Sequence, residues 1–507
     1  MRSDNPGPQM RAWAVVLIAM LTLGAAPSPA PPQAPDAVSH HTIALNGRTY
    51  AYTARAGTIT LTDEDHHPTC RMFYVAYTLD GADPNTRPVT FIYNGGPGSS
   101  TMWLHMGSIG PKRIATNSDG TETAGPPYRI VDNQYTLLDK SDLVFIDMPD
   151  SGFGRIIGNG KPKDFFGVDE DVAAFGQFVE RYITNFGRWN SPKFLFGESY
   201  GTTRSAALAA YLEGAGITVN GVVLQSTILS FALDWEFEPT GIGGGDWLFV
   251  LYLPTEASTA WYHHAVPYRG SLQSFAAQAE QFASTEYLDA LAQGAALSPA
   301  TYDDVVAKLH YYTGLSEQYI RDSNLRVPYW RFENELLREQ GKIVGRLDSR
   351  YWTFSLDPTA ELPDWDPTDA AIDAPYTTAV NEYLRQDLHY TTALRYRSSV
   401  YDIIAANGGW DWKHNGTEVT DVAVDLAEAM TYNKNLRVFS ANGYFDFATP
   451  FYATVYTLTH LNLVPAIQSH ITYGFYPSGH MIYLNIPSLA QYHADLERWY
   501  SRVLSVR

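Results

Sequence analysis

The chain of 507 residues contains a single cysteine, Cys70. A protein with one cysteine cannot form an internal disulfide bond, so its stability must come from a large packed core. This excludes the small secreted domains that disulfides hold together. The length allows about three domains, and the apolar fraction of 45% is that of a globular protein.

Basic residues are also scarce. The chain has 35 Lys and Arg and 54 Asp and Glu, which gives a net charge of −19. A nucleic-acid-binding protein needs a basic face that replaces the counterions of the phosphates. The composition therefore argues against that class of function. Like charges do not gather into a run of five or more, so no charged tail is predicted.

The sequence has no apolar run of the length of a membrane span. The longest run, from Ala12 to Ala26, covers about 15 residues, whereas a bilayer needs roughly 20. Arg2 and Arg11 precede it, and small residues and prolines follow. This order predicts a secretory signal peptide over 1–30 and a linker over 31–39, with an N-terminal anchor as the alternative. We expect a periplasmic or secreted protein without a membrane once the signal is removed.

Two kinds of strand pattern follow the linker. Between residues 40 and 95, short alternating runs separated by turn residues predict antiparallel hairpins; the runs are "HTIALNG", "RTYAYTA", "GTITLTD", "RMFYVAYTL" and "PVTFIYNGG". Later runs are continuously apolar, as in central parallel strands, namely "DLVFIDMP", "KFLFGES", "VNGVVLQST" and "LRVFSANG". Helical patterns such as "DEDVAAFGQFVERYITNF" lie between them. The alternation predicts an α/β fold with a mostly parallel central sheet and helices on both faces.

A long segment interrupts this alternation. It is rich in Trp and Tyr and has helical patterns such as "TYDDVVAKLHYYTGL". We interpret it as a helical lid domain inserted into the sheet domain. The predicted boundaries are a first part of the core over 40–229, the lid over 230–415 and a second part of the core over 416–507.

The stretch "KFLFGESYGTTRSAALAAYL" places Ser199 between two glycines, where a buried strand turns into an alanine-rich helix. Gly-x-Ser-x-Gly in this context is the nucleophile elbow, a turn so tight that only small residues fit beside the serine. The turn lifts the hydroxyl above the sheet and places it at a helix N-terminus, where the helix dipole favours negative charge.

An acyl-transfer serine needs an oxyanion hole and a base that an acid orients. The glycine-rich loop of "FIYNGGPGSS" offers free backbone N–H groups, and Tyr200 follows the nucleophile as second donor. Asp446 and His480 both come just after predicted strands, where open parallel sheets place their sites. Of the histidines after Asp446, only His480 lies in a glycine-containing loop behind a strand.

The motifs "NGGPGSS", "GESYG", "NGYFDFATPF" and "GHMIY", in this order, resemble the serine carboxypeptidase family of the α/β-hydrolase fold, in its bacterial form without lid cysteines. The resemblance includes "GRLDSRY" (345–351) in the lid. It implies a triad of Ser199, Asp446 and His480, and an oxyanion hole formed by Gly96 and Tyr200.

The resemblance also implies that Asn94 and Glu198 bind the C-terminal carboxylate of a peptide. Two facing carboxylates attract only if they share a proton, so peptide binding should favour acidic pH. Two positions depart from the family pattern, with Ile92 in place of a common Trp and Ser108 in place of a Glu. The carboxylate-binding network is therefore expected to be reduced or built differently.

We therefore predict a serine hydrolase that releases C-terminal residues from peptides. An esterase or acyltransferase on the same fold is the alternative, followed by a catalytically inactive binding protein. The chemistry requires no cofactor. The cluster "DEDHHPTC" (63–70) contains metal-ligating residue types, but between two strands it is interpreted as a hairpin loop, and no metal site is expected. The oligomeric state is left open, with a homodimer as one alternative.

Overall fold

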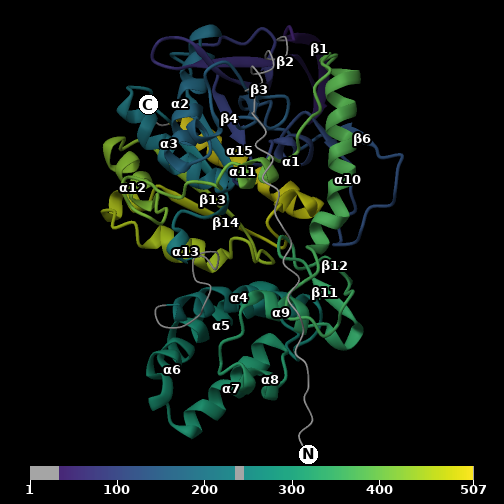
Figure 1. Ribbon diagram of the computed structural model, residues 1–507, viewed down its shortest axis with the longest axis vertical. Coiled ribbons are helices and arrows are strands. Elements are labelled where there is room, and N and C mark those ends of the chain that lie inside the picture. Colours follow the sequence, from purple (N-terminus) through teal and green to yellow (C-terminus); the bar gives the residue numbers. More distant parts are fainter. Residues whose placement is uncertain (1–33, 234–244, 506–507) are drawn as a thin grey trace, which may run out of the picture. The chain divides into compact units, whose positions relative to one another are not determined.

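The computed structural model describes residues 34–233 and 245–505, and its central feature is a ten-stranded sheet (Figure 1). The predicted signal peptide over 1–30 lies outside the described residues. The first strand begins at Ala37, within the segment predicted as linker. In the two described ranges, no helix has both the length and the apolar character that crossing a membrane requires.

The sheet combines an antiparallel edge with a parallel centre. Strands β1 to β3 pair antiparallel, β3 pairs antiparallel with β7, and all pairs from β7 to β14 are parallel. In order across the sheet the strands are β1 (Ala37–Leu45), β2 (Arg48–Thr62), β3 (Pro68–Leu79), β7 (Asp142–Ile146), β4 (Val89–Tyr93), β9 (Lys193–Ser199), β10 (Gly221–Thr227), β13 (Arg437–Gly443) and β14 (Ile471–Tyr476), with the short β8 (Arg155–Ile156) beside β3. The predicted parallel centre is confirmed.

Two of the hairpin predictions were wrong. "RTYAYTA" and "GTITLTD" form one strand, β2, because Gly57 is no turn but pairs in register with Tyr74. Its missing side chain leaves room for the carboxylate of Asp36. "PVTFIYNGG" contains β4, which is parallel to both its neighbours because β7 is inserted between β3 and β4. β4 is buried along its whole length, as is typical of a central parallel strand.

The polar residues of "DEDHHPTC" form the turn between β2 and β3. The backbone N–H of Asp63 donates to the carbonyl of His67 at 3.0 Å, and the N–H of His67 donates to Asp63 Oδ1 at 2.8 Å. Cys70 lies apart from them, fully buried in β3.

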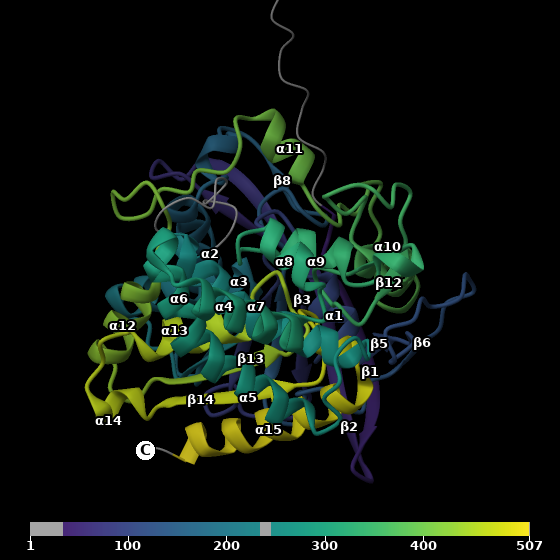
Figure 2. The same ribbon diagram turned by 90° about the horizontal axis from the view of Figure 1, so that it is seen from below.

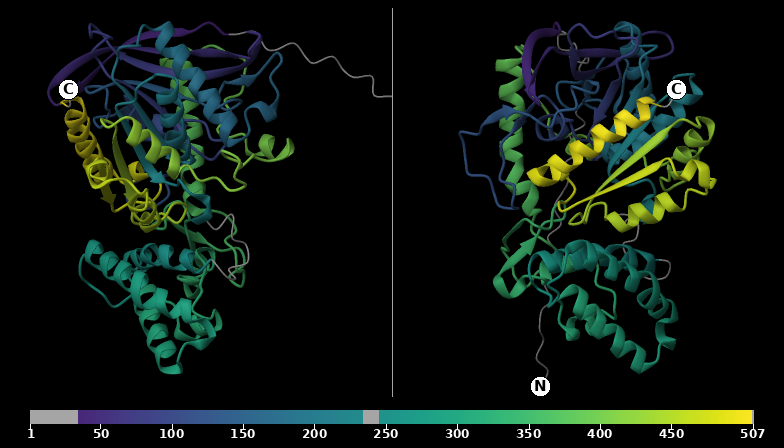
Figure 3. Two further views of the ribbon diagram at one scale, coloured as in Figure 1. Left: turned by 90° about the vertical axis from the view of Figure 1, so that its left-hand side faces the viewer. Right: turned by 180° about the vertical axis from the view of Figure 1, so that it is seen from behind.

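Helices cover both faces of the sheet. On one face α2 (Val168–Asn185), α3 (Tyr200–Gly214) and α12 (Ala423–Tyr432) pack over residues such as Leu195, and on the other face α15 (Ile486–Ser505) packs over Phe194. Figures 2 and 3 show α15 lying along β13 and β14. Alternate residues of each central strand thus enter different cores, which explains their unbroken apolar character.

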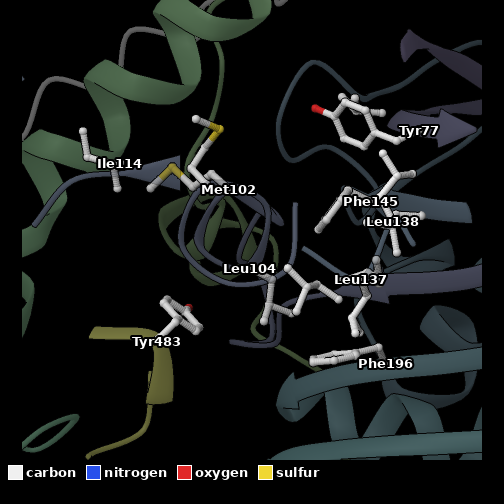
Figure 4. Packing of buried hydrophobic residues seen from close by; sticks show 14 of the residues in the cluster. Tyr77, Met102, Leu104, Ile114, Leu137, Leu138, Phe145, Phe196 and Tyr483 are labelled. Atoms are coloured by element: carbon white, nitrogen blue, oxygen red, sulfur yellow. The ribbon is translucent and has the colours of Figure 1, made fainter. Parts of the chain in front are cut away.

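The hydrophobic core on the face covered by α15 extends beyond that helix. It includes α1 (Met102–Gly107) and α10 (Pro367–Glu382), which contact each other, and the loop that carries Leu137 and Leu138. Figure 4 shows Leu104 of α1 and Phe196 of β9 among the packed side chains of this cluster. The helix α1 and the loop before it are thereby fixed against the strand that carries Ser199.

Six other α-helices of the 230–415 interval have a core of their own. Helices α4 (Asp246–Tyr262), α5 (Leu272–Phe282), α6 (Leu288–Gln293), α7 (Pro299–Thr313), α8 (Glu317–Asp322) and α9 (Tyr329–Glu335) bury one hydrophobic cluster, and Figures 1 and 3 show them gathered outside the sheet. Phe447 and the helix α13 (Phe451–Thr459) pack against this cluster, and α4 contacts α13. The later helix α10 belongs to the sheet core instead.

The other described elements are short. Two small antiparallel pairs, β5 (Lys112–Ile114) with β6 (Ile130–Asp132) and β11 (Lys342–Val344) with β12 (Trp352–Phe354), lie outside the main sheet. The short α11 (Tyr401–Ala406) and α14 (Pro465–Gln468) complete the α-helices in the described part of the chain.

A buried carboxyl in the helix α4 makes the stability of the protein depend on pH. Glu256 is 5% exposed among apolar side chains, and burial raises its pKa from 4.5 to about 8. A raised carboxyl pKa in the folded state means that ionisation opposes folding as pH rises above 4.5, with the full cost present above about 8. We predict that Glu256→Gln raises the free energy of unfolding at pH 8.5 by about 1–3 kcal/mol and leaves it nearly unchanged at pH 4.

Denaturant unfolding at the two pH values measures this difference. The exposed Glu339, replaced by Gln, is the matched control and should change neither value. Equal stability of wild type and Glu256→Gln at pH 8.5 would contradict the prediction.

Candidate active site

Ser199 lies at the tight turn between β9 and α3. Its backbone has φ of 61° and ψ of −133°, a conformation that a residue with a side chain rarely adopts. Gly197 makes the turn possible, because a Cβ there would collide with the carbonyl oxygen of Gly201. The turn places Ser199 immediately before the N-terminus of α3, as the sequence motif predicts.

His480 and Asp446 are hydrogen-bonded to each other, with Nδ1 of the imidazole 2.9 Å from Oδ2 of the carboxylate. Asp446 is fully buried and also accepts backbone N–H bonds from Ala448 and Thr449, at 2.9 and 3.0 Å, and the Thr449 hydroxyl at 2.7 Å. These donors fix the carboxylate, and the carboxylate fixes the imidazole. Burial lowers the pKa of His480, but the charge and hydrogen bond of Asp446 outweigh burial and raise the pKa above 6.5.

Glu198 is a buried carboxyl that accepts three hydrogen bonds. Asn94 Nδ2 donates to it at 2.6 Å, Gln225 Nε2 at 2.5 Å and the Tyr483 hydroxyl at 3.3 Å. Burial raises its pKa to about 7, although the charge of His480 and the hydrogen bonds from Tyr483 and Asn94 act in the opposite direction. The group therefore gains or loses its proton close to neutral pH.

Two backbone N–H groups are available beside Ser199. Within the described part of the chain, neither Gly96 nor Tyr200 donates its N–H to another protein group. The close approach of the two loops depends on Gly95, because a Cβ there would collide with the backbone nitrogens of Tyr200 and Gly201. Such a pair of free donors can stabilise an oxyanion.

Six of the seven predicted site residues line one cavity of about 810 Å³; they are Asn94, Gly96, Glu198, Ser199, Tyr200 and His480. The seventh, Asp446, lies behind His480 and is held there by the hydrogen bond between them. No hydrogen bond joins the Ser199 hydroxyl to His480 among the described residues. Catalytic hydrogen bonds are often long in ligand-free proteins and shorten when substrate binds.

The same cavity has a further acidic region. Asp366, Asp369 and Asp373 from the start of α10 contribute to its wall, together with one basic residue, Arg346. Burial, and then the charges of Asp366 and Asp373, raise the pKa of Asp369 to about 7. An anion that entered this cavity would therefore be repelled less as these side chains are protonated.

Comparison with known proteins shows the family of the chain. The model of the serine carboxypeptidase family matches residues 49–470, which include Ser199 and Asp446 and end before His480. This chain belongs to the serine carboxypeptidase family. The pheromone-processing carboxypeptidase KEX1 of Saccharomyces cerevisiae is 33% identical over 147 residues, in strains JAY291 and S288c. These matches cover 27% of this chain but only 18% and 19% of the two relatives.

A solved structure has a similar fold. The structure of Kex1(delta)p, described as a prohormone-processing carboxypeptidase from Saccharomyces cerevisiae, matches with a TM-score of 0.51 at 16% identity. The match covers 89% of this chain and 91% of the other. The predicted α/β-hydrolase fold is confirmed.

The two residues that depart from the serine carboxypeptidase pattern do not line the cavity. Ile92 is fully buried in β4, and its side chain belongs to the core beneath the sheet. Ser108 is also buried, after α1. Neither residue is among those that line the cavity in the described structure.

The sequence interpretation missed two partners of Glu198. Gln225 lies directly opposite Glu198 in the parallel pairing of β9 and β10, and a polar residue at the end of a buried apolar run was the available signal. Tyr483 lies in the turn after His480, and no pattern in the sequence indicates that its hydroxyl reaches Glu198. Together with Asn94 they form the hydrogen-bond network of this carboxyl.

The site geometry predicts a nucleophilic serine. A fluorophosphonate should label wild-type protein at Ser199, and Ser199→Ala should abolish labelling. His480→Gln should slow it by about 10³-fold or more, because the base is lost. The rate should fall as pH decreases through the pKa of His480, which lies above 6.5.

Mass spectrometry of the labelled peptide and the time course of labelling provide the measurement. Glu339→Gln serves as control, since this exposed residue is not among those lining the cavity. Equal labelling of wild type and Ser199→Ala would exclude the site.

Proposed function

We propose that this protein is a serine carboxypeptidase that releases C-terminal residues from peptides through an acyl-enzyme. The observation that carries the proposal is the pair Glu198 and Asn94, hydrogen-bonded at 2.6 Å in the same cavity as Ser199 and His480. A protonated Glu198 donates a hydrogen bond to a substrate carboxylate, and the Asn94 amide supplies a second donor. A nucleophile beside a carboxylate-binding pair suits cleavage at the end of a peptide.

In the proposed mechanism, Ser199 Oγ attacks the scissile carbonyl while His480 takes its proton. Asp446 holds Nδ1 of the imidazole and stabilises the imidazolium that forms. The backbone N–H groups of Gly96 and Tyr200 donate to the oxyanion. His480 then gives the proton to the leaving amine and activates the water that hydrolyses the acyl-enzyme.

We also propose that the helices of the 230–415 interval act as a lid, as expected from their place in the sequence. Asp369 of α10 and Tyr401 of α11 lie in this interval and line the cavity, which supports a role in substrate selection. Export from the cytoplasm is proposed on the N-terminal sequence pattern alone.

The pKa of Glu198 predicts how substrate binding depends on pH. Below about 7 the protonated Glu198 donates to the substrate carboxylate, and above that pH the two charges repel each other. The KM for a blocked dipeptide with a free carboxylate should therefore rise about 10-fold between pH 5.5 and 8.5. In Glu198→Gln, whose amide donates at any pH, the rise should be much smaller.

Steady-state kinetics on the free-acid dipeptide and on its amide measure this effect. The amide lacks the charge, so its KM should be nearly independent of pH in both proteins. Equal kcat/KM for acid and amide at pH 5.5 would contradict the carboxypeptidase proposal and favour the esterase or acyltransferase alternative.

A further inference from the structure

A segment of the inserted interval binds both loops that carry the acid and the base. Residues 345–351, "GRLDSRY", pass between these loops and pair with them through their backbone. The N–H of His480 donates to the carbonyl of Leu347 at 2.7 Å, and the N–H of Phe447 donates to the carbonyl of Arg346 at 2.9 Å. The positions of Asp446 and His480 thus depend on one shared strip of backbone.

Within this segment, a buried ion pair is hydrogen-bonded to the loop that ends at His480. Asp348 is fully buried and Arg350 is 2% exposed, and their side chains are joined at 2.5 Å. Asp348 Oδ2 accepts the N–H of Gly479 at 3.1 Å, and Arg350 donates to the Ser478 hydroxyl at 3.3 Å. Gly479 lies so close that a Cβ would be 2.5 Å from the Cα of Asp348.

The inserted helices hold the segment from its other side. On α10, Asp366 Oδ2 accepts the N–H of Leu347 at 2.8 Å, and the Thr368 hydroxyl accepts the N–H of Asp348 at 3.0 Å. On α4, Thr259 bonds the Ser349 hydroxyl at 2.6 Å. The segment is therefore a connection between the inserted helices and the two catalytic loops.

We propose that Asp348 and Arg350 are positioning residues that set the placement of the His480 imidazole relative to Ser199. The inference rests on the proposed function, because it assigns His480 as the base. A buried ion pair contributes little net stability compared with an apolar pair of similar volume, so stability alone is a weak reason for it. Its carboxylate and guanidinium instead hydrogen-bond two consecutive residues just before the base.

The test compares Asp348→Asn with a matched buried ion pair far from the cavity. Asp142 begins β7 and pairs with Arg188 at 2.6 Å and with Arg87 at 2.7 Å, all three side chains being nearly inaccessible, and none of them lines the cavity. Asp348→Asn and Asp142→Asn should both lower the unfolding temperature. Only Asp348→Asn should slow fluorophosphonate labelling, by about 10- to 100-fold, because the base is displaced.

Two further measurements separate positioning from a general loss of structure. Asp348→Asn should lower kcat without raising KM, and should shift or broaden the low-field NMR resonance of the His480 Nδ1 proton that is hydrogen-bonded to Asp446. Arg350→Lys keeps the charge but loses the planar fork, so its effects should be intermediate. If Asp348→Asn does not fold, Arg350→Lys provides the comparison with Asp142→Asn.

If Asp348→Asn and Asp142→Asn have equal labelling rates and equal His480 resonances, the inference is overturned. The ion pair of Asp348 and Arg350 would then contribute to structure alone. If wild-type protein is not labelled at all, the proposed function fails instead. The crystal structure of Asp348→Asn then decides the positioning question. Separation of His480 from Leu347 or Asp446 supports it, and an unchanged loop contradicts it.

Discussion

The turn at Ser199 is the constraint on which the site depends. Ser199 has a positive φ at the end of a central strand, and neighbouring backbone segments pass very close to this turn. The glycines at 95, 197 and 201 provide the space, because a Cβ at each would collide with backbone atoms. The strained turn is held because β9 lies in the middle of a sheet that is covered on both faces. The helix α3 that follows is buried along most of its length, which fixes the turn at its N-terminus.

The electrostatics of the cavity follow from burial. Glu198, Asp369 and His480 share a cavity with more acidic than basic side chains, and burial favours the neutral form of each. For His480 the fixed carboxylate of Asp446 outweighs that preference, whereas Glu198 has only neutral donors and keeps a pKa near 7. Asp446 and Glu198 thus differ in their hydrogen-bond partners, because Asp446 accepts from an imidazole and Glu198 accepts from two amides and a phenol.

Much of this site could be predicted from the sequence because its motifs are local. The elbow, the glycine-rich loop and the two loops after strands each lie within a few residues, and the parallel order of the strands brings their ends together. Gln225 and Tyr483 could not be placed, because their contacts depend on strand register and on a turn. The segment 345–351 was recognised as part of the resemblance. Its hydrogen bonds to the loops of Asp446 and His480 could not be predicted, because they join residues that are about a hundred or more positions apart in the sequence.

The errors in the fold have the same origin. Gly57 has the sequence signature of a turn, yet it continues a strand because a carboxylate from β1's N-terminal side fills its space. The direction of β4 could not be read from its own residues, since it depends on β7, a strand some fifty residues later, entering between β3 and β4. In both cases a contact distant in sequence overrides a local pattern.

The central claim is that Ser199, His480 and the two backbone donors act on one carbonyl carbon. A crystal structure of the protein after reaction with a fluorophosphonate tests it directly. The account predicts phosphorus bound to Ser199 Oγ, a phosphoryl oxygen roughly 3 Å from the nitrogens of Gly96 and Tyr200, and the His480 imidazole within hydrogen-bonding reach of Ser199 Oγ. An adduct on another residue, or an imidazole at 480 turned away from the serine, would contradict it.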